Sequence, residues 1–385
     1  MLAIASSTFD APSETFIRDH IRGIAPGETV LLCEGELGVG GFGYPILSLP
    51  RPWRPKILGW RLGNMIARQR ANWIAPGLRS ADHRRIRAFF EEYRVEAALA
   101  EYGPMGCRLW PVCRSCDVPL YVHFHGYDAS ILVRDWRWIR RYRRMFDAAA
   151  GVIAPSKFLA SRLVEIGCPE AKLHVSPYGV DAQRFTPTQR LPQRLVAVAR
   201  LVEKKAPHLT IEAFGRLRGY FPEAELDMVG DGPLADRCQT LIRDFGLGDC
   251  VRMHGVKGTD FVADLLQQAS IFVQHSVTAL DGDSEGLPVA ILEAMSAALP
   301  VVATRHSGIP EAVEEGVTGL LVGEHDVAGM ATSIAALLQD PLRAAAMGMA
   351  GRQRVVENFT QERMHDRLRA IMVLPPVETA TSRVA

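Results

Sequence analysis

The sequence lacks any apolar run approaching the roughly 20 residues that a membrane-spanning helix needs. Its opening segment, LAIASS, is too short and uncharged to be a secretory signal peptide, and it is predicted to form a first β-strand instead. From these two absences we expect a cytoplasmic protein.

Cysteine is scarce, and its seven residues are scattered without the spacing of a disulfide framework. Cys113 and Cys116 form a lone CxxC, with no second pair to complete a metal site. We expect free thiols and no metal.

A strong overall charge is also missing, since the formal net charge is +1. With no reader motif, this disfavours nucleic-acid binding. The halves differ, however: residues 1–178 carry 24 Lys and Arg against 17 Asp and Glu, and the remainder carries 20 against 26. The basic first half either meets something anionic or carries ordinary solvated charge.

Basic and aromatic residues mix in two segments of that half, Arg51–Lys56 and Arg134–Asp147, the second with six Arg. At helical spacing the second segment predicts an apolar stripe opposite a basic face. Two interpretations stay open: a core-packed helix with solvated arginines, or a surface that rests on an anionic membrane.

The length of 385 residues predicts two domains. Both halves repeat strand, loop and helix, which predicts α/β architecture with two doubly wound parallel sheets. We place the domains at 1–178 and 179–358, on either side of a break at Pro177–Asp181. Within the first domain we predict an irregular insertion at 35–60, a helix at 61–73 and a connecting segment at 99–118. Residues 375–385 are expected to form a disordered tail.

One stretch, Ser284–Pro300, joins a loop to a predicted helix that has Pro288 as its first residue and that Pro300 ends. Glu285 lies in the loop and Glu293 in the helix, so both carboxylates can face one ligand at the helix N-terminus. Such a terminus favours a phosphate. The alternative is an amphipathic surface helix with two solvated glutamates.

Further candidates follow other predicted strands. Arg200 and Lys205 come between a strand and a helix start, a good arrangement for a pyrophosphate. Gly230 and Gly232 lie in a turn where a ligand could approach the backbone closely, although turns use the same residues.

A histidine pair ends another predicted strand. His123 and His125 share one face of it, and such a pair can bind metal, but no further ligand is evident nearby. His125 lies at the carboxyl end of the strand, where open α/β sheets bind ligands. A purely structural histidine is the alternative.

These landmarks agree in order and spacing with one family. The segments GDGP (230–233), HGV (254–256), EGLPVAILEAM (285–295) and SGIPE (307–311) strongly resemble the retaining glycosyltransferases of family 4. FHGYD (124–128), APSKFL (154–159) and PYGVDAQRF (177–185) extend the resemblance over nearly the whole chain. It implies the GT-B fold, two Rossmann-like domains that face each other across a cleft. A narrower resemblance is to bacterial exopolysaccharide and colanic-acid-type enzymes.

The resemblance implies a nucleotide-sugar donor and gives each candidate a role. Arg200 and Lys205 match the pair that holds the diphosphate and stabilises it as leaving group, so no metal or other cofactor is expected. Glu285 matches the carboxylate on the sugar hydroxyls and Glu293 the one on the ribose. The remaining donor contacts match the N–H groups of Gly286 and Leu287, the glycines Gly230 and Gly232, the base-binding segment His254–Val256, and His125 beside the reacting carbon.

In this family the acceptor attacks the donor sugar from the face that the leaving group occupies, without a separate base. The anomeric configuration is therefore retained. We expect a glycan or lipid-linked acceptor in bacterial surface polysaccharide assembly, with peripheral contact to the anionic inner membrane. The last helix, at 360–373, is expected to return to the N-terminal domain. Two alternatives stay open: a sugar-nucleotide epimerase of the same fold, and a non-catalytic binding subunit.

Overall fold

The computed structural model describes residues 1–9, 14–35, 43–49 and 78–375. Its contacts divide the chain into two compact units. Unit 1 comprises Met1–Ala154, Ala160–Ser176 and His365–Ala385, and unit 2 comprises Pro155–Leu159 and Pro177–Met364. The predictions for Arg51–Lys56, for a helix at 61–73 and for the tail lie mostly or wholly outside the described residues.

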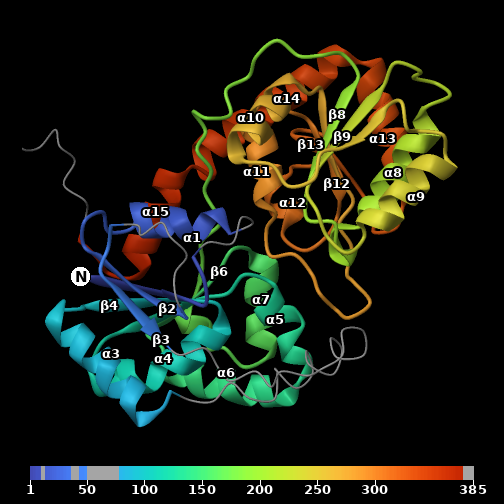
Figure 1. The fold of residues 1–385 in the computed structure, drawn as a ribbon. Helices are drawn as coiled ribbons and strands as arrows, with labels where there is room; N and C mark the ends of the chain where they lie inside the picture. The colour runs from blue at the N-terminus through green and yellow to red at the C-terminus, as the bar shows by residue number, and fades with distance from the viewer. Residues whose placement is uncertain (10–13, 36–42, 50–77, 376–385) are drawn as a thin grey trace, which may run out of the picture. The chain divides into compact units, whose positions relative to one another are not determined.

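Unit 1 is built on a parallel sheet with strand order β3-β2-β1-β4-β5-β6-β7 (Figure 1). The strands are β1 (Leu2–Ser6), β2 (Thr29–Glu34), β3 (Ile46–Leu49), β4 (Ala97–Glu101), β5 (Leu120–His123), β6 (Gly151–Ala154) and β7 (Leu173–Val175). The helices that begin in this unit's part of the chain are α1 (Thr15–Gly23), α3 (Ser80–Glu92), α4 (Gly103–Ser115), α5 (Tyr127–Ser130) and α6 (Trp136–Ala148). The central strands are apolar and fully buried, as strands covered on both faces must be.

Unit 2 repeats the plan with the order β10-β9-β8-β11-β12-β13, again all parallel. Its strands are β8 (Arg194–Val198), β9 (Glu225–Val229), β10 (Val251–Met253), β11 (Ile271–Gln274), β12 (Val301–Thr304) and β13 (Gly319–Val322). Its helices are α8 (Pro207–Leu217), α9 (Ala235–Asp244), α10 (Thr259–Gln268), α11 (Val289–Ser296), α12 (Ile309–Ala312), α13 (Val327–Gln339) and α14 (Pro341–Asn358), while α7 (Lys157–Glu165) runs from unit 2 into unit 1.

Each sheet reverses its strand order once, between β1 and β4 in unit 1 and between β8 and β11 in unit 2. Ligands of open α/β sheets bind outside the carboxyl ends of the strands at such a switch point. The predicted fold class, α/β with two doubly wound Rossmann-like sheets, is confirmed.

Three local predictions need correction. Residues 99–118, expected only to connect two elements, form the end of β4 and helix α4. Pro104 lies in the first turn of α4, where a proline is tolerated, and buried Met105, Leu109 and Val112 hold the helix against the core despite Pro111. Strand β3 lies where we expected an irregular insertion.

Helix α11 begins at Val289, one residue later than predicted, because Pro288 is extended and serves as the N-cap. The helix ends at Ser296, three residues before the predicted end. Ala298 takes a left-handed conformation (φ 58°), so its N–H bonds to the Met295 carbonyl while the Leu299 N–H bonds to that of Ala294. This pair of bonds is the Schellman motif that closes helix ends.

The last helix, α15 (Gln361–Ile371), contacts unit 1 through its second half. His365 Nε2 lies 3.1 Å from the Asp19 carbonyl oxygen, and Arg369 Nε donates to the Ile24 carbonyl at 2.6 Å. None of the described helices is long and apolar enough to cross a bilayer. All seven cysteines are free, as predicted, and burial raises the pKa of the Cys113 thiol to about 12.

Candidate active site

The switch point of unit 2 carries the main cluster of predicted residues. Strand β8 runs into Arg200 and a short 3₁₀ turn (Glu203–Lys205), and the neighbouring strand β11 runs into the loop that carries Glu285. Because adjacent parallel strands end at the same edge of a sheet, residues some 80 positions apart in sequence meet here.

Lys205 and Glu285 form a buried ion pair at this edge. Lys205 Nζ lies 3.1 Å from Glu285 Oε2, and Lys204 Nζ lies 3.9 Å from Oε1. Lys204 also donates to Asp283 Oδ1 at 3.0 Å and to the Ser284 carbonyl at 3.2 Å. The other carboxylate oxygen, Glu285 Oε1, is buried and has no hydrogen-bond partner within the described part of the chain.

The charges of this pair follow from its surroundings. Burial alone would raise the pKa of the Glu285 carboxyl, but the ammonium groups of Lys205 and Lys204 outweigh it and lower that pKa to about 2. Burial lowers the pKa of the Lys205 ammonium, against the opposing effect of Glu285. Glu285 is therefore ionised at neutral pH.

Arg200 completes the positive charge at this edge. Its side chain is exposed and forms no hydrogen bond or ion pair with any described residue. Ala206 takes a left-handed conformation (φ 36°) that turns the chain, and Pro207 then begins helix α8. Two side-chain cations therefore precede a helix start, whose partial positive charge suits an anionic ligand.

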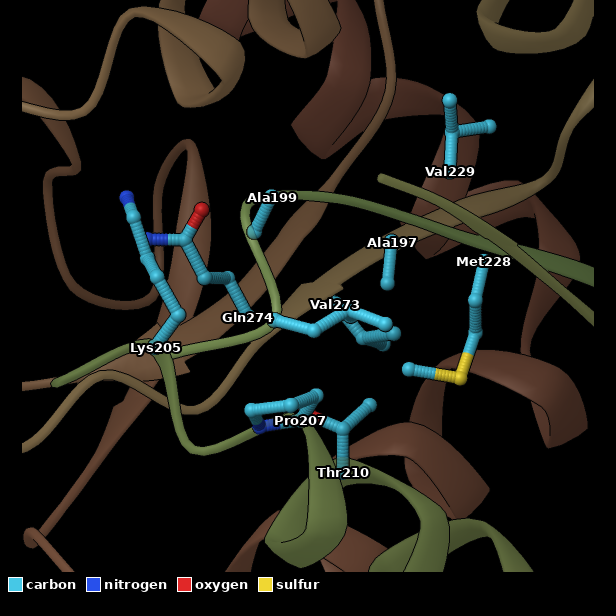
Figure 2. A pocket seen from close by; sticks show the side chains of 10 residues that line it. Ala197, Ala199, Lys205, Pro207, Thr210, Met228, Val229, Val273 and Gln274 are labelled. Carbon is cyan, nitrogen blue, oxygen red and sulfur yellow. The ribbon is translucent and has the colours of Figure 1, made fainter. Parts of the chain in front are cut away.

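A small apolar cavity lies next to Lys205, with Lys205 and Gln274 on one side of it (Figure 2). Its free space is about 10 Å³, close to the minimum for one water molecule. It is lined by residues of β8, β9, β11 and α8, and it is too small for a nucleotide or a sugar.

Gly230 and Gly232 are glycines for a reason the sequence did not reveal. Their φ angles are +134° and +158°. A Cβ added to Gly230 would lie 1.9 Å from the Ala199 carbonyl oxygen, and one on Gly232 would lie 2.5 Å from that of Leu201. The turn is thus packed on the loop that carries Arg200, and any larger residue would push the two loops apart.

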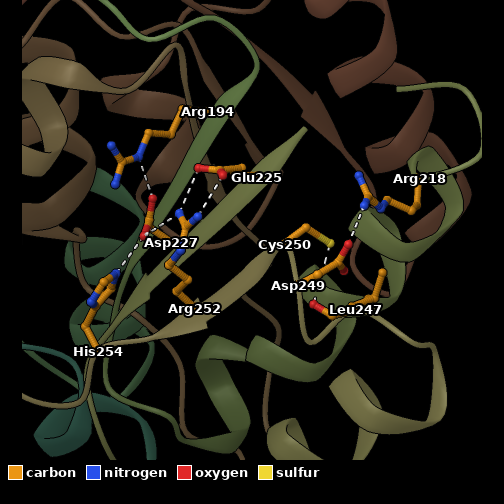
Figure 3. A network of polar contacts seen from close by, with 9 residues as sticks. All are labelled: Arg194, Arg218, Glu225, Asp227, Leu247, Asp249, Cys250, Arg252 and His254. Atoms are coloured by element: carbon orange, nitrogen blue, oxygen red, sulfur yellow. Dashed lines mark hydrogen bonds and ion pairs between the residues drawn. The ribbon is translucent and has the colours of Figure 1, made fainter. Parts of the chain in front are cut away.

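The predicted base-binding segment carries a buried network at its start (Figure 3). His254 Nε2 lies 2.6 Å from Asp227 Oδ1, and Arg194 Nε donates to Asp227 Oδ2 at 2.6 Å. Burial alone would raise the pKa of the Asp227 carboxyl, but these two bonds lower it. Beyond the network, the Gly255 carbonyl accepts from Gly230 N–H at 2.9 Å, and Val256 is 64% exposed.

The remaining donor candidates follow Glu285 in the chain. Leu287 and Gly286 follow it in the loop and are buried, and Glu293 lies half-buried on α11. Among the predicted residues, Lys205 and Glu285 are brought into direct contact.

His125 belongs to a second buried cluster, at the switch point of unit 1. Glu101 ends β4 and its carboxylate meets two imidazoles: His20 Nδ1 lies 2.7 Å from Oε1, and His125 Nε2 lies 2.8 Å from Oε2. Burial alone would raise the pKa of the Glu101 carboxyl, but His20 and His125 lower it well below its usual range.

The idea that the histidine pair has no further metal ligand nearby was wrong. His20, Glu101 and His123 offer ligand atoms within 4.8 Å of one another, all fully buried. This group includes His123 but not His125. Burial lowers the pKa of His123 well below its ordinary value.

The His125 ring is covered. Phe16 and Tyr102 lie against it, each with a ring-centre distance of 4.5 Å, and its side chain is only 4% exposed. The predicted contact of His125 with the donor sugar stays a prediction.

Sequence reasoning missed Lys204, Glu101 and Asp227. Asp227 left a signal, a carboxylate inside the apolar strand ELDMV. Lys204 was overlooked beside Lys205, and Glu101 was missed because β4 was not predicted.

Comparison with known proteins relates this geometry to a family. The family model described as glycosyl transferases group 1 matches residues 183–354, and the model for glycosyltransferase family 4 matches residues 70–184. The putative colanic acid biosynthesis glycosyltransferase WcaL of Escherichia coli K12 is 36% identical over 288 residues, which cover 73% of this chain and 71% of WcaL. The chain belongs to this glycosyltransferase family.

Other similarities agree with this assignment. The amylovoran biosynthesis glycosyltransferase AmsK of Erwinia amylovora is 35% identical over 65% of this chain and 62% of its own length. Anabaena HepE, solved in complex with UDP and glucose, has the same fold, with a TM-score of 0.75 at 16% identity over 97% of this chain and 99% of that one. The predicted family, GT-B fold and glycosyltransferase activity are confirmed.

Proposed function

We propose that this glycosyltransferase takes a nucleotide sugar as donor, with the diphosphate on Arg200 and Lys205 and a sugar hydroxyl on Glu285. The observation that carries the proposal is the Lys205–Glu285 pair. Lys205 binds Glu285 Oε2, and the second oxygen, Oε1, is buried and lacks a hydrogen-bond partner among the described residues. A buried acceptor left unsatisfied costs about 1–3 kcal/mol. A donor hydroxyl removes that cost.

The cations also account for the chemistry. Negative charge develops on the diphosphate as the sugar leaves, and Arg200, Lys205 and the N-terminus of α8 are already placed to stabilise it. This electrostatic arrangement does the work that a divalent metal does elsewhere, so the reaction is metal-independent.

We assign the other predicted residues to the nucleotide and the phosphates. Glu293 accepts from the ribose hydroxyls, and the N–H groups of Gly286 and Leu287 lie toward the phosphates. The base lies along the backbone near Val256.

The transfer retains the anomeric configuration. The acceptor hydroxyl attacks from the leaving-group face, the C1–O bond to the diphosphate breaks, and the departing phosphate oxygen takes the acceptor proton. Glu285, with a pKa of about 2, is ionised at neutral pH and so cannot act as a general acid. Because the departing phosphate oxygen takes the acceptor proton, this reaction needs no glycosidase-type pair of carboxylates.

We place the reaction in bacterial surface polysaccharide assembly, on a glycan or lipid-linked acceptor. The support is that the relatives WcaL and AmsK are named for colanic acid and amylovoran biosynthesis. Exopolysaccharide and lipopolysaccharide pathways both offer such acceptors. Nothing in the fold or the comparisons favours an epimerase, and the intact charge cluster speaks against a non-catalytic subunit.

We also propose peripheral contact with the anionic cytoplasmic leaflet through α6. Trp138, Tyr142, Met145 and Phe146 of this helix are buried, so its basic face points outward. Trp136 is 63% exposed, and with Arg137, Arg140, Arg141 and Arg144 it lines a hollow of about 390 Å³. An exposed aromatic beside clustered arginines suits a headgroup layer.

The donor assignment is tested by binding and turnover. Nucleotide sugars are screened for a rise in melting temperature, and transfer by the best donor is compared between wild type, Lys205→Ala and Arg216→Ala, an exposed control on α8. We expect Lys205→Ala to lose at least about 100-fold in kcat/KM, as when a stabilising group is removed from a developing charge. Donor binding that is undiminished in Lys205→Ala would contradict the assignment.

Three further measurements test the finer points. EDTA should leave the rate unchanged, and NMR of the product should show the donor's anomeric configuration. Wild type should sediment with anionic liposomes at low salt, and Arg140→Glu/Arg144→Glu should not. If wild type stays in the supernatant, the membrane contact is wrong.

A further inference from the structure

The Glu324 carboxylate is connected to both ends of the loop that carries Glu285, directly at one end and through His306 at the other. This loop, residues 276–287, leaves β11 and enters α11. Glu324, just after β13, accepts from the Thr278 backbone N–H near the start of the loop, with a distance of 2.8 Å to Oε2. Its other oxygen, Oε1, lies 2.6 Å from His306 Nδ1.

His306 carries the connection to the far end of the loop. It follows β12, its side chain is 1% exposed, and its Nε2 accepts from the Glu285 backbone N–H at 3.2 Å. A carboxylate can only accept and a backbone N–H can only donate. When Nε2 accepts from the Glu285 N–H, the ring proton lies on Nδ1, which faces Glu324. The Ser307 hydroxyl, 3.0 Å from Nε2, can donate to the same nitrogen.

A second contact between the same two loops supports this reading. A Cβ added to Gly308 would lie 2.2 Å from the Gly286 carbonyl oxygen. Only glycine lets the loop after β12 approach this closely. Gly286, next to Glu285, is thus held against Gly308, two residues after His306.

The Glu285 side chain takes part in donor binding, and a separate set of contacts holds its backbone. We propose that His306 and Glu324 are positioning residues that hold Glu285 in its donor-binding orientation before the donor arrives. The proposal rests on the proposed function. The contacts from Glu324 through His306 to Glu285 preorganise the loop. Without them, part of the binding free energy of the donor is used to order the loop, so the affinity for the donor falls.

The expected effect is on affinity rather than on chemistry. His306→Leu leaves the Glu285 N–H buried without an acceptor, and such a loss corresponds to about a 5- to 150-fold rise in the donor Kd and KM. Since the bound donor restores the loop, kcat at saturating donor should stay within about threefold of wild type.

A conservative variant separates positioning from packing. His306→Gln keeps an amide oxygen for the Glu285 N–H and an amide NH₂ for Glu324, so it should recover most of the affinity. Glu324→Leu should behave like His306→Leu. His325→Asn, at an exposed neighbouring histidine, is the control and should match wild type.

Hydrogen exchange without any donor keeps this test independent of the proposed function. We expect faster amide exchange within 276–287 in His306→Leu, unchanged exchange in the core strands, and near-normal exchange in His306→Gln. If the loop loosens but wild type binds no nucleotide sugar, the proposed function fails and the positioning role stands. If wild type binds donor and His306→Leu shows unchanged exchange and unchanged KM, the positioning proposal is overturned.

Discussion

The two units place similar groups at equivalent points of their sheets but neutralise them differently. In unit 1, Glu101 ends β4, His125 follows β5, and His20 lies on the helix after β1. In unit 2, Glu285 follows β11, His306 follows β12, and Lys205 follows β8. By strand order, β1, β4 and β5 correspond to β8, β11 and β12.

The difference lies in what meets the carboxylate. Two imidazoles bond to the Glu101 side chain, whereas ammonium groups meet the Glu285 side chain and an imidazole meets its backbone. An imidazole can lose its proton near neutral pH, but an ammonium retains a charge over a wider range. The unit 1 carboxylate is therefore held by hydrogen bonds to imidazole rings, whereas the unit 2 carboxylate is held by ammonium groups.

The largest effect on stability should come from breaking the charged cluster. Glu285→Ala leaves the Lys205 ammonium buried without its carboxylate, and the free energy of unfolding should fall by about 3–5 kcal/mol. Urea denaturation measures it. Glu223→Ala, at an exposed carboxylate of the same unit, should stay within about 0.5 kcal/mol of wild type. A loss below 1 kcal/mol for Glu285→Ala, on the order of a surface pair, would contradict the role of Lys205 and Glu285 as a buried ion pair.

A smaller loss of stability is expected from the cluster around Glu101. Glu101→Gln keeps the shape of the side chain but offers only one acceptor oxygen to two imidazoles. The free energy of unfolding should therefore fall by about 1.5–3 kcal/mol, the range for hydrogen bonds to charged groups. The exposed control is Glu28→Gln. If Glu101→Gln proves as costly as Glu285→Ala, the two clusters do not differ in the way proposed.

Lowering the pH should reduce the stability of both units, because each contains histidines that are buried in the neutral form. Burial lowers the pKa of His208 and of His275 to about 4, and that of His123 well below its ordinary 6.5. Between pH 6.5 and about 4 these histidines bind protons in the unfolded chain but not in the folded chain. The free energy of unfolding therefore falls as the pH falls. Unfolding at pH 7, 5.5 and 4.5 measures this loss, and His275→Gln should reduce its slope. A flat profile would rule out neutral burial of these rings.

The smallest effect should come from an exposed pair beside a buried one (Figure 3). Arg252 bonds both oxygens of Glu225 at 2.7 Å, but the two side chains are 44% and 39% exposed. Arg252→Ala should therefore lower the free energy of unfolding by only about 0.5 kcal/mol. A thermal melt at low and high salt tests this, since screening should remove most of the difference.

The sequence could predict the fold because each unit repeats strand, loop and helix with clear breaks, and because Arg200, Lys205 and Glu285 follow strands. It could not predict which strands are neighbours, and that order alone brings Lys205 to Glu285. Strand β4 was missed because its residues, AALAE, are strong helix formers and include none of the β-branched residues typical of strands.

Details that depend on distant packing were also out of reach. His125 is covered by Phe16 and Tyr102, which come from separate elements, and no local pattern announces that contact. Likewise, nothing in GDGP (230–233) shows that its glycines are required by the carbonyls of Ala199 and Leu201.

Helix α15 has a consequence for the order in which the protein is made. Arg369 donates to the carbonyls of Gly23 and Ile24, and the Ile24 bond spans 345 positions. At roughly 5–20 residues per second on the ribosome, those carbonyls wait about 17–70 s for their partner. The chain of unit 2 is nearly continuous, so unit 2 can finish folding while unit 1, begun first, still lacks its last helix.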